Sequence, residues 1–128
     1  MESKYFFNLE EEVEREPLPK NQEMSMRFLK HLEFSGVNIA QLKSKIDPHH
    51  HSDHDEIIVV IRGEHEFTVA DETRKVKPGD LVVVPAGVPH GVNAGKEYAV
   101  LSIYAPAWEE ENPDRVFLEK KTSNWKRP

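Results

Sequence analysis

The sequence has no cysteine among its 128 residues. This absence excludes a disulfide framework, a thiolate metal site and a cysteine nucleophile. No apolar stretch approaches the roughly 20 residues of a membrane-spanning helix, and the N-terminal residues are followed by acidic ones where a secretory signal would be apolar. The formal net charge of −6 offers no basic surface to nucleic acid. We therefore expect a cytoplasmic protein that binds neither membranes nor nucleic acid.

Charged side chains are plentiful, at 31% of the residues against about 25% in typical soluble domains, and the length suits one globular domain. We predict an N-terminal arm over residues 1–24, a barrel over 25–108 and a tail over 109–128. The acidic run after Asn8 predicts a solvated arm or a short exposed helix capped by that residue. The tail suits one helical turn starting at Asn112.

Short β-branched and alternating segments separated by glycine and proline turns fill the middle of the chain. We predict strands over residues 26–34, 37–46, 57–61, 65–70, 73–77, 81–84, 90–93 and 98–104. The run 57–61 is predicted to be buried on both faces, and Gly63 to turn it into a hairpin with 65–70. Phe117, Leu118 and Trp125 are predicted to fold back on the barrel. The pattern predicts an all-β sandwich or barrel.

Histidine is concentrated in one segment, since four of the seven histidines lie within residues 49–54. Side chains two residues apart on a strand point the same way, so His49 and His51 can share a face while His50 points to the other. His90 follows a distant proline- and glycine-rich turn. Neutral imidazoles are ligands for borderline divalent metals. The pattern predicts a metal site completed by two separate strands.

A carboxylate follows the histidines. Glu56 is spaced to return to the same site after a short turn, although Asp53 and Asp55 are competitors. Three imidazoles and one carboxylate fill four positions of an octahedron and leave two for water or substrate, which is typical of a catalytic metal site. His54 could be exposed, line the mouth of the site or move protons.

These residues resemble the two sequence motifs of the cupin superfamily. The first motif is matched by His49, His51, Glu56 and Gly63, and the second by Gly79, Pro85, Gly87 and His90. The resemblance implies a jelly-roll β-barrel that holds one divalent ion on His49, His51, Glu56 and His90. Iron and manganese are favoured, and nickel and zinc are also known in this superfamily.

The chain departs from the usual motifs at two places. Lys43 stands where the first motif usually opens with glycine, and Asn93 comes one residue earlier than the usual asparagine of the second motif. Neither position is a ligand, so the departures bear on local backbone and leave the predicted site intact.

The two open coordination positions motivate the hypothesis of an enzyme that acts on a small organic molecule, either as a dioxygenase or as an isomerase of sugars or sugar acids. Glu56, after release from the metal, or His54 would move a proton. A non-enzymatic module that binds metal or a small ligand is the alternative. Small cupins commonly form homodimers, and the apolar segment 5–7 offers a surface for pairing.

Side chains on the barrel wall are candidates for binding the substrate. Alternation along the strands points to Gln41, Phe67, Tyr104 and Trp108, although aromatic residues on strands more often pack in a core. Arg62 follows a buried strand and could reach an anionic ligand, but an arginine at a turn is more often solvated.

Overall fold

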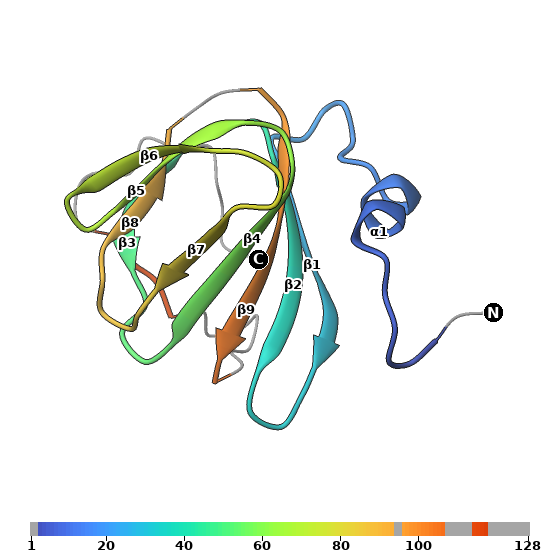
Figure 1. The fold of residues 1–128 in the computed structure, drawn as a ribbon, viewed down its shortest axis with the longest axis horizontal. Coiled ribbons are helices and arrows are strands. Elements are labelled where there is room, and N and C mark those ends of the chain that lie inside the picture. Colours follow the sequence, from blue (N-terminus) through green and yellow to red (C-terminus); the bar gives the residue numbers. More distant parts are fainter. Residues whose placement is uncertain (1–2, 94–95, 107–113, 118–128) are drawn as a thin grey trace.

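Two antiparallel β-sheets lie face to face in the computed structural model, and one short helix packs outside them (Figure 1). The structure describes residues 3–93, 96–106 and 114–117. The arrangement is the jelly-roll predicted from the strand pattern. Within the described part of the chain, no helix has the length and apolar character needed to cross a membrane.

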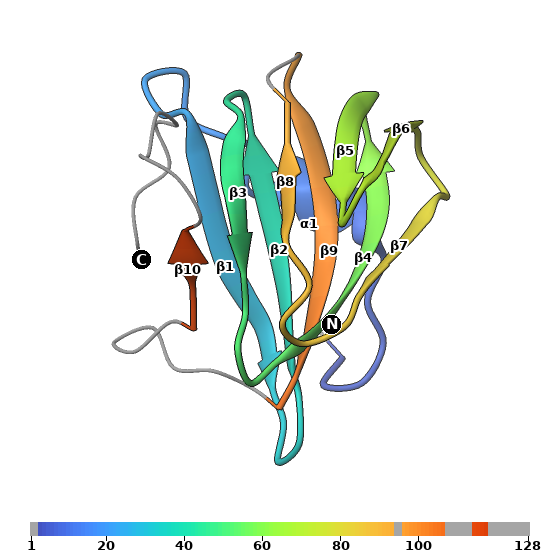
Figure 2. The ribbon, with the colours of Figure 1, turned by 90° about the vertical axis from the view of Figure 1, so that its left-hand side faces the viewer.

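Each sheet has five strands in the described residues, and strands far apart in sequence are neighbours in both. The first sheet, in spatial order, contains β1 (Met24–His31), β2 (Gly36–Leu42), β9 (Tyr98–Ala105), β4 (Asp55–Arg62) and β7 (Leu81–Val84). The second contains β10 (Val116–Phe117), β3 (Ile46–His50), β8 (His90–Val92), β5 (His65–Val69) and β6 (Glu72–Val76). Figure 2 shows the second sheet in front of the first.

Alternating side chains from both sheets fill the space between them. On β4, Glu56, Ile58 and Val60 are buried, whereas Ile57 between them is 37% exposed. Ile58 and Val60 belong to one apolar cluster with Phe67 of the second sheet. The prediction that the run 57–61 is buried on both faces is therefore wrong for Ile57. The strand has one face on the core and leaves part of the other to solvent.

The predicted strand over residues 37–46 is two strands. The chain leaves the first sheet at the end of β2, passes through Lys43–Lys45 and enters the second sheet as β3. The alternation in the sequence continues through the break, because a strand that changes sheets keeps the same face toward the shared core. The crossing brings the histidines of β3 opposite the first sheet.

Gly63 also marks a crossing between sheets. It does not form the predicted hairpin, because β4 pairs with β7 and β9 while β5 pairs with β6 and β8. Gly63 has φ of +82°, and a Cβ atom there would lie 2.8 Å from the carbonyl oxygen of Glu97. Both the positive φ and the close approach require glycine at this corner.

The acidic segment near the N-terminus forms α1 (Leu9–Arg15) on the outer face of the first sheet. The side chain of Asn8 accepts a hydrogen bond from the backbone N–H of Glu11, so the predicted cap is confirmed. One edge of the helix is buried, with Val13 packing against Ile39 of β2. Arg62, a candidate for an anionic ligand, instead contacts carboxylates of this helix.

The C-terminal residues that the structure describes return to the barrel. Phe117 lies on β10, which pairs with β3, and its ring centroid is 5.5 Å from that of His49. Its predicted packing on the barrel is confirmed. Asn112, Leu118 and Trp125 lie outside the described residues.

His65 makes stability depend on pH. It is 3% exposed, stacks on Tyr98 with ring centroids 3.9 Å apart, and neither ring nitrogen has a hydrogen-bond partner among the described residues. Burial lowers the pKa of His65 from 6.5 to about 4. Between these values the unfolded chain binds a proton that the folded protein does not, so stability falls as pH falls.

We expect His65→Leu to remove about 3 kcal/mol of this pH dependence between pH 6.5 and 4. Urea unfolding across that range measures it, with the exposed His31 replaced by Gln as the control. Parallel stability–pH curves for wild type and His65→Leu would show that His65 is not the source.

Candidate metal centre

Three histidines from the second sheet form a cluster in the interior. His49 lies on β3, His51 follows that strand, and His90 opens β8, where it is the register partner of His49. One ring nitrogen from each lies within 4.8 Å of those of the other two, and all three side chains are buried. The structure thus brings together the three histidines that the spacing predicted.

Local backbone geometry lets the two strands meet. Gly91 follows His90, and a Cβ atom there would lie 2.9 Å from the carbonyl oxygen of Ile46 on β3. Gly87, with φ of +83°, donates its N–H to the carbonyl oxygen of His51 at 2.7 Å. The glycine-rich turn before His90 is therefore bonded directly to the segment that carries the other histidines.

Glu56 reaches the cluster from the opposite sheet. Its Oε1 atom is 3.0 Å from Nε2 of His51 and 3.1 Å from Nε2 of His90. The competing carboxylates lie elsewhere, since Asp53 is exposed and Asp55 accepts the N–H of Ala86 at the surface. Glu56 is thus the carboxylate that the fold brings to the histidines.

The outer nitrogen of each imidazole faces a backbone carbonyl. The Nδ1 atom of His49 lies 2.9 Å from the backbone oxygen of Asp47. The Nδ1 atoms of His51 and His90 lie 2.5 Å and 3.1 Å from the backbone oxygens of Asp114 and Val88, respectively. Carbonyl oxygens only accept, so each Nδ1 carries a proton and donates it. An imidazole that is neutral in this tautomer presents an unprotonated Nε2 atom to the interior.

Three imidazole nitrogens therefore lie close together, and a carboxylate oxygen of Glu56 lies against two of them, those of His51 and His90. Two acceptors cannot bond each other, so the contacts of Glu56 with His51 and His90 require a cation between them, either a proton or a metal ion. In an octahedral site with metal–ligand bonds of about 2.1 Å, neighbouring ligand atoms lie about 3.0 Å apart. The two distances from Glu56 to the histidines match this spacing. The residues present fit a divalent metal.

Electrostatics keep this donor set in its ligating form. Burial, followed by the neighbouring His90, lowers the pKa of His49 from 6.5 to about 3. Burial alone would raise the pKa of Glu56, but its contacts with His51 and His90 hold that pKa below its ordinary value. At neutral pH the site presents a neutral imidazole and a carboxylate at these two positions.

His54 lies outside the histidine cluster. Its Nδ1 atom donates to Oδ2 of Asp114 at 2.7 Å, and the same carboxylate accepts the backbone N–H groups of Ser52 and Asp53 at 2.9 and 2.6 Å. His54 therefore helps to hold Asp114 against the 51–54 loop. Its predicted role in moving protons stays a prediction. His50 is half-buried and is not part of the cluster.

Asp114 was not predicted from the sequence. Its backbone oxygen orients His51, while its carboxylate binds the loop that carries His51. Burial alone would raise the pKa of Asp114, but the N–H group of Asp53 and the imidazole of His54 lower it overall. No local pattern marks this residue, because every one of these contacts spans about half the chain.

A cavity of about 50 Å³ lies beside the cluster. Its polar or charged lining residues are His49, Glu56, His90, Tyr98, Ser102, Tyr104 and Arg115, and its apolar ones are Met24, Met26, Ala40, Leu42, Ile46, Ile58, Phe67, Val92 and Val100. Among the predicted wall residues, Phe67 and Tyr104 line it. Gln41 instead donates to the carbonyl of Glu16, and Trp108 lies outside the described residues.

Tyr104 joins the cavity to the cluster. Its ring meets that of His51 edge-on, with centroids 5.5 Å apart. Burial, and then the carboxylate of Glu56, raises the pKa of Tyr104 well above its ordinary value. Tyr104 is therefore a neutral phenol at physiological pH.

The sequence matches the family model described as the cupin domain over residues 38–104. The chain belongs to the cupin family. This match spans both sheets and contains all four residues of the candidate metal centre. The cupin thus has a histidine cluster that suits a single metal ion.

Relatives agree with this assignment. An uncharacterized protein of Aquifex aeolicus (strain VF5) is 30% identical over 118 residues, which is 88% of this chain and 98% of the relative. A conserved protein with a double-stranded β-helix domain from Klebsiella pneumoniae has a TM-score of 0.69 at 26% identity, covering 93% of this chain and 100% of its own. KdgF from Halomonas sp. shares the fold, with a TM-score of 0.66 at 22% identity, and the match covers 74% of this chain and 91% of KdgF.

Proposed function

We propose that this cupin is a metal-dependent enzyme acting on a small organic molecule. The observation that supports it is the cluster of three buried histidines, with Glu56 against two of them, beside a cavity. His49, His51, His90 and Glu56 would hold one divalent ion, with manganese or iron favoured over nickel and zinc. When bound, such an ion supplies a Lewis acid, or a redox centre if it is iron.

The chain's own residues complete the site. Apolar walls exclude water and strengthen electrostatic interactions inside the cavity. Tyr104 is held neutral by burial and contacts Glu56, so it can act as a hydrogen-bond donor beside the site. Oε1 of Glu56 lies 3.0 and 3.1 Å from two histidines, so it is fixed in place and can receive a proton only when one of those contacts is broken.

A dioxygenase consumes oxygen and an isomerase does not, so an assay of oxygen consumption distinguishes the two hypotheses. The protein would be loaded with iron(II), manganese, nickel or zinc and its metal content measured. Oxygen consumption would be followed with catechols, thiols and diketones, and isomerisation of sugars and sugar acids by NMR. Turnover in one of these sets supports the proposal, whereas stoichiometric metal without turnover in any of them favours the binding module.

We also propose that the chain forms a homodimer through its N-terminal arm. Tyr5 and Phe6 are 84% and 83% exposed. Exposed aromatic side chains in one surface segment are typical of interaction sites. Sedimentation velocity of the wild type and of Phe6→Glu tests the pairing, and cytoplasmic residence stays a prediction.

A further inference from the structure

We infer that the ligand of the cavity carries a carboxylate that pairs with Arg115. This inference rests on the proposed function, because it concerns the same cavity and requires the metal ion beside it. It goes further by naming the chemical class of the ligand and the residue that selects it.

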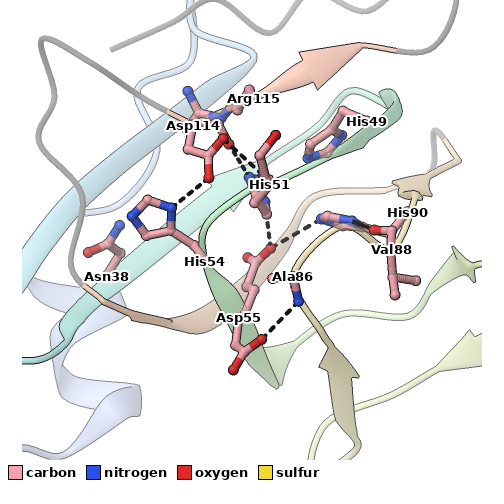
Figure 3. Close-up of polar contacts among 12 residues, drawn as sticks. Asn38, His49, His51, His54, Asp55, Ala86, Val88, His90, Asp114 and Arg115 are labelled. Carbon is pink, nitrogen blue, oxygen red and sulfur yellow. Dashed lines mark hydrogen bonds and ion pairs between the residues drawn. The ribbon is translucent and has the colours of Figure 1, made fainter.

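Arg115 reaches the cavity from outside the two cupin motifs. Asp114, which precedes Arg115, binds the 51–54 loop (Figure 3). Val116 and Phe117, which follow Arg115, pair with β3. Arg115 itself is 6% exposed and lines the cavity. Its Nη2 atom lies 3.9 Å from Sδ of Met26, another residue of the cavity lining. The segment thus places a guanidinium in the barrel interior.

The balance of charge favours an anionic ligand. The charged side chains that line the cavity, among the residues the structure describes, include the carboxylate of Glu56 and the guanidinium of Arg115. A divalent ion would add two positive charges within mainly apolar walls. Uncompensated charge in such surroundings is strongly unfavourable, so a ligand that brings negative charge is favoured.

The planar shape of the arginine guanidinium favours ligands that carry a planar oxyanion. A guanidinium presents a rigid fork of N–H groups that matches two carboxylate oxygens, and it keeps its charge at all physiological pH values. The cavity of about 50 Å³ has room for roughly four water molecules. The part of the ligand that enters is therefore a small carboxylic acid or the carboxylate arm of a larger molecule.

Glycolate and glycolamide form a pair of probes of nearly equal shape that differ in charge. We expect manganese-loaded wild type to bind glycolate at least roughly tenfold more tightly than glycolamide in isothermal titration, as a charge-assisted hydrogen bond implies. Arg115→Gln should abolish that preference while manganese affinity stays within about threefold. Arg115→Lys should retain part of it, because the charge remains without the fork.

The exposed Arg74 of β6 provides the matched control. Arg74→Gln should leave the preference for glycolate unchanged. Equal affinity of wild type for the two probes, or an unchanged preference in Arg115→Gln, would overturn the inference while leaving the proposed function in place. Absence of manganese binding by the wild type would contradict both. If Arg115→Gln does not fold, the same comparison is made with Arg115→Lys, and an undiminished preference for glycolate in that variant would overturn the inference.

Discussion

Replacing His51 with alanine is expected to lower manganese and zinc affinity by more than roughly 100-fold, beyond the loss typical of an outer partner of a metal ligand. His51 supplies one of the four proposed ligands, and its Nε2 atom lies 3.0 Å from Oε1 of Glu56. Removing it leaves three donors and also frees the carboxylate that it helps to fix. Competition with a coloured chelator measures the affinity.

The neighbouring His50 is the matched control for this substitution. It lies on the same strand, is half-buried and is outside the cluster, so His50→Ala should retain metal affinity within about threefold. Thermal unfolding of both metal-free variants checks that they are folded. Equal metal affinity of His51→Ala and wild type would show that the cluster is not the binding site.

Replacing Asp114 with alanine is expected to lower metal affinity by roughly 10- to 100-fold, although this residue's carboxylate touches no predicted ligand. The carboxylate accepts two backbone N–H groups and His54, and so fixes the loop between His51 and Glu56. Without it the loop loses its anchor, and the carbonyl that orients His51 moves with the released segment. Asp114→Asn should lose less, because its amide oxygen can still accept from one N–H group.

Asp80→Ala is the control that distinguishes a role of Asp114 in positioning His51 from a general effect on stability. Its carboxylate likewise accepts a backbone N–H, that of Lys77 at 2.9 Å, in a turn away from the cluster. Asp80→Ala should lower the melting temperature without changing metal affinity. If Asp114→Ala lowers the melting temperature and leaves both metal affinity and the NMR signal of the His51 Nδ1 proton unchanged, Asp114 is structural only.

The sequence predicts the elements of this fold better than their connections. The alternation over residues 37–46 is real, yet it spans two strands in different sheets. Alternation records which face meets the core, and that face stays the same across a change of sheet. Gly63 shows the same difficulty, since a positive φ suits a hairpin turn and a corner between sheets equally well.

The histidines of the site are predictable because their spacing reflects the two-residue repeat of a strand and a second motif supplies the distant partner. Asp114 and Arg115 are not predictable in this way. They meet the site only through the pairing of β10 with β3, a contact that no local pattern encodes. His54 illustrates the consequence, because its partner was missing from every sequence-based interpretation of it.

An anomalous diffraction map of crystals grown with manganese tests the central claim most directly. The account predicts one peak per chain between the two sheets, about 2.0–2.3 Å from Nε2 of His49, His51 and His90 and from a carboxylate oxygen of Glu56. The three Nδ1 atoms should still donate to the carbonyls of Asp47, Asp114 and Val88. A peak bound elsewhere, or no peak at a manganese concentration that saturates the protein in solution, would contradict it.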